Sequence, residues 1–373
     1  MDMEPGQDGI TLFLCGDVML GRGIDQIMHC PGDPTLYESY VTSALGYVEL
    51  AEKAHGPIPR DCPFDYVWGD ALGDLDAARP AARIINLETS ITTSLRPVPK
   101  GINYKMHPGN VRCVKQAKVD CCVLANNHVL DWGQAGLLET LSVLRREGLA
   151  AAGAGTDLAE AEKPVEIALA EGARRLLVFG LGSTTSGIPR DWAARPDRPG
   201  VWLLPDLSPV AASRSSERIL AMRKPGDLAV VSIHWGSNWG YEVPDEQRSF
   251  AHALIDAGAC DLIHGHSSHH PRPLEVYKGR LVLYGCGDFI TDYEGIYGYE
   301  QYRGDLALAY LARYSGEGAL SELTLVPYQM HRFRLRRASK KDTDWLQSTL
   351  DRESAPFGTH IALKDTRLAA AWQ

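Results

Sequence analysis

Short apolar runs recur along the chain, and each run stops at a residue with a turn-forming or metal-binding side chain. A run of this length, four to seven apolar residues, is typical of a buried β-strand. Because the carboxyl ends of strands in an α/β sheet form one edge, we expect the side chains there to converge. The runs are residues 10–17, 83–88, 120–127, 228–235, 260–266 and 280–288.

Helical patterns separate several of these runs. Residues 136–148 carry Leu137, Leu141 and Leu144 at helical spacing and end at a glycine, and residues 249–258 close in the same way. Residues 164–182 predict a hairpin that turns at Glu171–Gly172, and residues 305–329 predict another near positions 316–318. The pattern therefore predicts an α/β fold with mixed sheets and helices on the outside.

The overall composition excludes several classes of partner. The formal net charge is −9, so the chain has no broad basic surface for nucleic acid or anionic lipid. The first ten residues are polar and acidic, unlike a signal peptide, and no apolar stretch is long enough to span a bilayer. We expect a cytoplasmic protein without membrane contact, whose eight cysteines are reduced and, lacking a CxxC pair, do not bind zinc.

The strongest local signal is the run HGHSSHHPRP, which places four histidines within seven residues. Imidazole is a common metal ligand and an acid or base near neutral pH, so we predict a metal-binding or catalytic role. The alternative is a hydrated polar turn stiffened by prolines. Further donors follow the other apolar runs, and a mixed set of this kind suits Zn²⁺, Mn²⁺ or Fe²⁺. The donors are Asp17, Glu88, Asn127, His128, His234, His264, His266 and His269.

Six motifs in order resemble the CapA-like (poly-γ-glutamate capsule protein) family, over about residues 10–292. They are GDVMLGRGID, INLETSIT, ANNHVLDWG, SIHWGSNW, HGHSSHHPRP and LYGCGDFI. That family is similar to calcineurin-like metallophosphoesterases. The resemblance implies a four-layer sandwich of two facing mixed β-sheets flanked by helices, with one or two divalent metal ions. We expect one catalytic domain over residues 1–330, with residues 331–373 as a helical or irregular extension packed on it.

The resemblance also implies roles for individual residues. Asp17 matches the first metal-binding aspartate, and Glu88 takes the place of the bridging acidic group. Asn127 and His128 match an Asn-His motif, and His234 matches a lone downstream histidine. The final histidine pair would be His266 and His269, although the spacing leaves the choice among His264, His266, His269 and His270 open.

One position departs from the metallophosphoesterase pattern. These enzymes begin with Asp-x-His, whereas here the third residue is Met19, whose thioether is a poor ligand for a hard or borderline cation. We therefore expect one of two metal sites to be weaker, or to be completed by substrate or by another side chain. Because phosphoryl transfer needs two firmly held ions, this departure disfavours ordinary phosphoester hydrolysis.

Three functions compete, and epimerisation of a peptide Cα is the leading one. In that reaction a metal acidifies the Cα–H of a peptide or carboxylate-bearing substrate, and one group removes the proton while another returns it. Soluble relatives in this family include epimerases of lasso-peptide precursors, which this chain resembles in lacking an anchor. The candidate bases are Asp17, Asp131, His266 and His269, and the candidate aromatic floor is Trp235, Trp239 and Tyr241.

The other two functions use the same residues differently. A metal-dependent hydrolase would cleave a phosphoester or amide, with Arg22 and Lys105 holding an anionic group of the substrate. A non-catalytic or accessory protein of poly-γ-glutamate synthesis would keep the fold without the chemistry. Asp288, in the last motif, and Asp292, shortly after it, either orient histidines or cap a turn.

Overall fold

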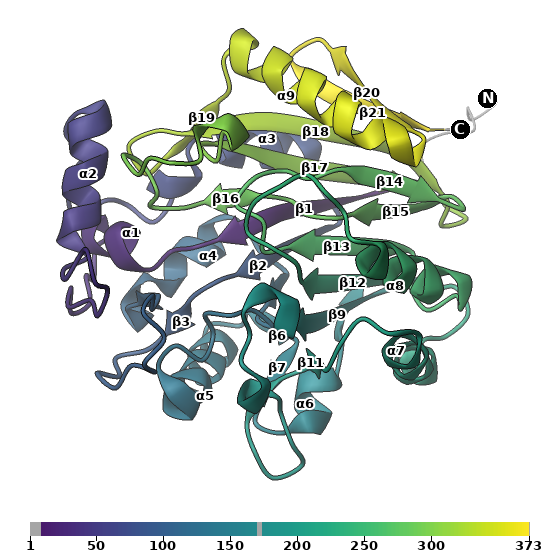
Figure 1. Ribbon diagram of the computed structural model, residues 1–373, viewed down its shortest axis with the longest axis horizontal. Helices are drawn as coiled ribbons and strands as arrows, with labels where there is room; N and C mark the ends of the chain where they lie inside the picture. The colour runs from purple at the N-terminus through teal and green to yellow at the C-terminus, as the bar shows by residue number, and fades with distance from the viewer. Residues whose placement is uncertain (1–8, 170–173, 373) are drawn as a thin grey trace, which may run out of the picture.

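Two mixed β-sheets form the centre of the computed structural model, which describes residues 9–169 and 174–372 (Figure 1). The larger, ten-stranded sheet contains β1 (Ile10–Val18), β2 (Ala82–Leu87), β5 (Cys121–Val123), β6 (Ala150–Ala152), β16 (Asp288–Ile290), β17 (Leu306–Tyr314), β18 (Leu320–Met330), β19 (Leu335–Arg337), β20 (Thr359–Lys364) and β21 (Arg367–Trp372). Its order is β20-β21-β18-β17-β1-β2-β5-β6, with β16 paired to β1 and β19 to β18.

The second sheet has seven strands. They are β8 (Val165–Ala168), β9 (Arg175–Ser183), β11 (Leu203–Leu204), β12 (Leu228–His234), β13 (Leu262–His266), β14 (Leu274–Tyr277) and β15 (Arg280–Leu283). Both predicted hairpins are present as antiparallel pairs, β8 with β9 and β17 with β18. The turn predicted at Glu171–Gly172 lies outside the described residues.

The alternation of side chains along each strand builds three apolar layers. In β1, Leu12 and Leu14 point between the sheets, where they join Val230 of β12, whereas Phe13 and Cys15 belong to the layer on the outer face. Helices α3 (Asp70–Ala78), α4 (Arg112–Gln116) and α5 (Gly133–Arg146) cover that outer layer. Helices α7 (Pro209–Met222) and α8 (Asp245–Asp256) cover the other sheet. The structure therefore confirms two mixed sheets flanked by helices.

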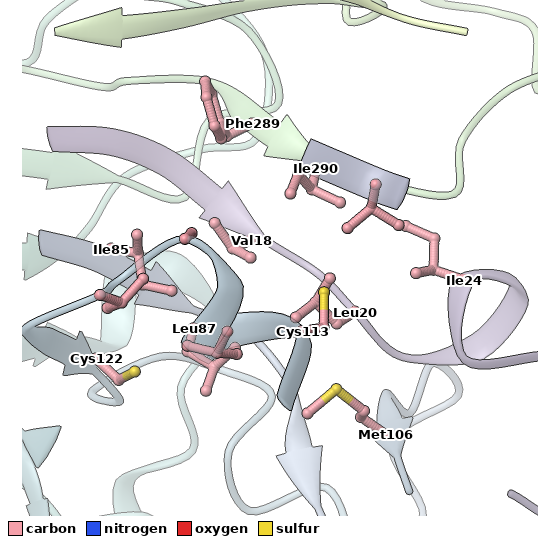
Figure 2. Packing of buried hydrophobic residues seen from close by; sticks show 14 of the residues in the cluster. Val18, Leu20, Ile24, Ile85, Leu87, Met106, Cys113, Cys122, Phe289 and Ile290 are labelled. Atoms are coloured by element: carbon pink, nitrogen blue, oxygen red, sulfur yellow. The ribbon is translucent and has the colours of Figure 1, made fainter. Parts of the chain in front are cut away.

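The outer layer of the large sheet continues up to the strand ends that position the site. Figure 2 shows Val18 between Ile85 and Ile290, and Leu20 beside Cys113, all within one apolar cluster. All eight cysteines are free, and those such as Cys113 and Cys122 act as small apolar side chains. Among the described residues, no helix has the length and apolar character needed to cross a membrane.

The C-terminal segment extends the large sheet. After β19 come helix α9 (Lys340–Ser354) and the hairpin β20–β21, and β21 pairs antiparallel with β18. The sequence pattern predicts helical or irregular structure here and gives no signal for the hairpin. The reason is physical: most side chains of β20 are exposed, and the apolar run of β21 is largely alanine, which favours helix over strand.

Candidate metal centre

Polar side chains gather where strands of both sheets end. Asp17 lies one residue before the end of β1, and Asp288 pairs with it in register at the start of β16. His234 and His266 are the last residues of β12 and β13 and are also register partners. The convergence expected from the strand-end pattern is therefore present, and the four side chains are buried.

The first potential ligand group consists of Asp17, His234 and His266, whose donor atoms all lie within 4.8 Å of one another. The two Nδ1 atoms of His234 and His266 are 2.7 Å apart, and Asp17 Oδ1 is 4.0 Å from His266 Nδ1. When both rings are neutral, at most one proton fits between these two nitrogens. At least one of the two Nδ1 atoms therefore carries a lone pair. This group thus offers two imidazoles and one carboxylate to a cation.

The second group consists of Asp17, His269 and Asp288, again within 4.8 Å. His269 Nδ1 lies 2.9 Å from Asp288 Oδ1. Asp288 Oδ2 is buried and has no hydrogen-bond partner among the described residues, which is costly for a carboxylate oxygen unless a ligand meets it. Asp288 therefore offers a carboxylate oxygen to a metal, whereas the buried Met19 has only a thioether.

Glu88 and Asn127 extend the donor set on the side of β2 and β5. Glu88 Oε1 lies 3.9 Å from His234 Nε2 and 3.8 Å from His128 Nε2. Asn127 Oδ1 lies 3.1 Å from the same His234 nitrogen. Asn86, which sequence reasoning missed, donates to Asp17 Oδ1 at 2.8 Å and to Glu88 Oε2 at 3.1 Å. It fixes the two carboxylates side by side, as an outer-sphere partner does.

Asp131, predicted as a base, is saturated with hydrogen bonds. Its carboxylate contacts His128 Nδ1 at 2.6 Å and accepts from Lys100 Nζ at 2.6 Å and from the Tyr104 N–H at 2.7 Å. It therefore orients the His128 ring instead of facing the centre. Lys100 carries no sequence signal that would have placed it here, since it lies in a loop far from the motif.

The histidine run divides into two pairs. His266 and His269 belong to the ligand groups, as the resemblance implies. His264 uses both ring nitrogens elsewhere, Nδ1 at 2.9 Å from Ser232 Oγ and Nε2 at 2.7 Å from the Cys15 carbonyl oxygen. His270 Nε2 accepts from the Gly240 N–H at 3.1 Å. The structure thus places His264, a predicted ligand, in the sheet interior and outside both potential ligand groups.

The electrostatics of the centre favour a bound cation. Burial, together with the nearby charge of Asp288, raises the pKa of Asp17 to about 7. Burial likewise raises the pKa of Glu88 well above its ordinary value, while it lowers the pKa of His234 and His266. Buried carboxylates beside neutral imidazoles need a positive partner. The residues present therefore fit a divalent metal ion.

Metal binding should strengthen as the pH rises. Asp17 has to lose its proton before it can bind a metal, and its pKa near 7 means that half of the metal-free protein is still protonated there. Because the ionised fraction of Asp17 rises from about one tenth at pH 6 to about one half at pH 7, we expect the affinity for Mn²⁺ to increase about fivefold over this range, with proton release on binding. Isothermal titration in buffers of different ionisation enthalpy measures both. An affinity that is constant over this range would contradict the prediction.

A cavity of about 430 Å³ borders the centre at His269. Its wall is largely aromatic: Trp239 stacks on Tyr299 with ring centroids 4.1 Å apart and planes 2° apart. Tyr241 is half-buried against the His270 ring, 4.7 Å away. Of the residues predicted to form an aromatic floor for the substrate, Trp239 lines the cavity and Tyr241 does not.

Three other predicted substrate residues are engaged elsewhere. Trp235 is 1% exposed and packs in the core against Phe250 and Tyr284, so its ring has no free face. The Lys105 ammonium lies over the Trp132 ring at 4.1 Å and does not line the cavity. Arg22 does line the cavity. Its guanidinium, however, is bound to Asp292 and Glu38 at 2.5 and 3.0 Å.

Comparison with known proteins agrees with this geometry. Residues 11–293 match the family described as bacterial capsule synthesis protein PGA_cap. A probable polyglutamine synthesis accessory protein of Mycobacterium tuberculosis is 45% identical over 98% of this chain and 97% of its own length. The PGA biosynthesis protein CapA of Bacillus subtilis is 28% identical over 87% of this chain and 72% of its own length. The chain belongs to the PGA_cap family of bacterial capsule synthesis proteins.

Proposed function

We propose that this protein is a divalent-metal-dependent enzyme that acts on an amide-linked glutamyl or glutaminyl chain during the synthesis of such a polymer. The observation that carries the proposal is the convergence of two ligand groups on Asp17 beside an aromatic cavity. The names of the relatives, which concern polyglutamine and PGA synthesis, supply the substrate class. A scaffold without chemistry has no need to bury so many charged donors at one point.

The centre provides the groups that amide chemistry requires. Asp17, His234, His266, His269 and Asp288 would hold the metal, of which one or two ions fit. A bound divalent ion supplies Lewis acidity toward a carbonyl oxygen.

His128 is placed to accept a proton. The Asp131 carboxylate accepts a hydrogen bond from His128 Nδ1–H. The lone pair of the neutral ring therefore lies on Nε2, which faces Glu88. Burial lowers the pKa of His128 to about 4, which keeps the ring neutral at pH 7. The Nε2 lone pair of His128 is therefore free to bind the metal or to accept a proton, although a pKa of about 4 makes the ring a weak base at pH 7.

Epimerisation at a Cα is the second candidate, and one observation favours it. Two histidines in the centre are each backed by a carboxylate, His128 by Asp131 and His269 by Asp288. Tyr104 and Tyr293 lie beside these rings and are joined to each other by a 2.9 Å hydrogen bond. Two such pairs suit a reaction in which one group removes a proton and another returns it.

Removing the metal should abolish turnover. We expect full-length protein treated with a chelator to lose activity on poly-γ-glutamate or polyglutamine, and to regain it with Mn²⁺, Zn²⁺ or Fe²⁺. Polymer length, measured by size-exclusion chromatography, reports cleavage. Deuterium at Cα after incubation in D₂O, with no change in length, reports epimerisation. Full activity after exhaustive chelation would overturn the proposal, as would unchanged length and no exchange with either polymer and every metal.

A further inference from the structure

A second cluster of metal-binding side chains lies away from the centre described above. It consists of His55, the last residue of α2 (Leu45–His55), Glu294 in the loop after β16, and His331 directly after β18. One donor atom from each residue lies within 4.8 Å of the others. None of the three belongs to the six family motifs or to the ligand groups that contain Asp17.

The backbone around the cluster holds Glu294 firmly. Its Oε1 accepts the Arg332 N–H at 2.7 Å and its Oε2 accepts the Phe333 N–H at 2.5 Å. Both of these residues have left-handed backbone angles, with φ of 59° and 55°, which non-glycine residues rarely adopt. The tight turn that they form also places His331 beside the carboxylate.

A close approach of two backbones brings Glu294 to the end of α2. The next residue, Gly295, has φ of 83°, and a Cβ at that position would lie 2.5 Å from the Leu50 carbonyl oxygen. Only glycine permits this contact. As a result, His55 Nδ1 lies 2.6 Å from Glu294 Oε1. The three donors therefore come from three chain segments that are each fixed independently of a ligand.

A simple ion pair explains only part of this arrangement. His55 with Glu294 would suffice for one, and a partly exposed pair contributes little to stability. The second imidazole, on His331, lies with its ring centroid 4.6 Å from that of His55, so two protonated rings would repel each other. Within residues 9–169 and 174–372, no hydrogen bond occupies the His331 ring nitrogens. Two imidazoles and one carboxylate are a ligand set typical of Zn²⁺ with an open position.

We propose that His55, Glu294 and His331 form a second cation site, specific for Zn²⁺ or a similar borderline ion. His55 and Glu294 line the same cavity as His269, so an ion held here faces the space beside the main centre. Glu294 is 7% exposed, which gives the ion one well-shielded anionic ligand. An open coordination position would remain for water or for a carboxylate group in the cavity.

Zinc stoichiometry tests this proposal directly. Metal-depleted full-length protein is dialysed against Zn²⁺ alone, and the bound zinc per chain is measured for the wild type, His55→Ala and His331→Ala. We expect each variant to bind one zinc fewer than the wild type. The matched control is His360→Ala, which removes an exposed histidine 3.2 Å from Asp351 but with no second imidazole. It should bind as much zinc as the wild type.

The outcome that would overturn the proposal is equal zinc binding by the wild type and both site variants. Circular dichroism shows whether each variant is folded. Should His331→Ala fail to fold, His331→Gln keeps the size of the side chain and takes its place in the comparison. Because this experiment uses no substrate, its failure would leave the proposed function untouched, and failure of the activity assay would leave this site untouched.

Discussion

Asp17→Asn should abolish tight binding of a divalent metal to the main centre, and with it the turnover of any glutamyl polymer. Asp17 is the residue that both ligand groups share, and it also accepts hydrogen bonds from Asn86 and from the Ser267 N–H. Loss of an outer-sphere partner already costs about 10–100-fold in affinity, so loss of a charged ligand should cost at least about 100-fold.

The same substitution should stabilise the metal-free protein. The pKa of Asp17 is raised from 3.8 to about 7 in the folded chain, mainly by burial. A raised carboxyl pKa means that the folded state is penalised as the pH rises above 3.8, and that the full penalty is present above 7. An amide of the same shape removes the charge, although its NH2 group then faces one of the two N–H donors that the carboxylate accepts, which offsets part of the gain. We therefore expect a higher melting temperature than the wild type without metal at about pH 8, and no further rise when metal is added.

Calorimetry with and without Mn²⁺ measures both effects. Asp120→Asn is the matched control, because Asp120 is another carboxyl whose pKa burial raises, but it only accepts the Arg83 N–H, outside the site. That variant should keep its metal-dependent rise in melting temperature. Asp17→Asn protein that binds Mn²⁺ as tightly as the wild type would show that Asp17 is not a ligand.

Much of the centre follows from the sequence because strand ends are easy to recognise. Asp17, His234 and His266 each follow a run of apolar residues, and parallel pairing within each of the two sheets brings such ends to one edge of that sheet. The alternation along β1 is equally readable, since Leu14 and Cys15 must face opposite sides. The fold class and the approximate position of the site can therefore be predicted from local sequence patterns.

The remaining features depend on pairings that no local pattern specifies. Asp288 becomes a candidate ligand only because β16 pairs with β1 and places it opposite Asp17, although the two residues are far apart in the chain. His264 and His266 point in related directions along one strand, yet His264 contacts Ser232 and a backbone carbonyl, whereas Nδ1 of His266 faces His234. Trp235 directly follows a strand-end histidine, as a floor residue would, but packs inward against Tyr284. The residue types alone do not show which of these side chains face the centre and which pack into the core.

Asp292→Ala should lower the free energy of unfolding by about 3–5 kcal/mol, the loss typical of removing one partner of a buried ion pair. Arg22 and Asp292 are both buried, and the guanidinium contacts the carboxylate through two nitrogens, at 3.1 and 2.5 Å. Asp292 also accepts the Gly23 N–H at 2.9 Å. Without it, the Arg22 charge would remain inside the protein, stacked on Tyr47, with only Glu38 as a counter-ion.

Urea denaturation measures this loss, and Asp256→Ala provides the comparison. Asp256 forms an exposed ion pair with Lys278 at 2.6 Å, so its removal should leave the free energy of unfolding almost unchanged. The result also decides the role of Arg22, which lines the cavity and is predicted from the sequence to bind an anionic group. A loss near 3–5 kcal/mol means that Asp292 holds the guanidinium and that a substrate carboxylate would have to displace it. A loss as small as that of the exposed pair would instead mean that Arg22 is free to bind substrate.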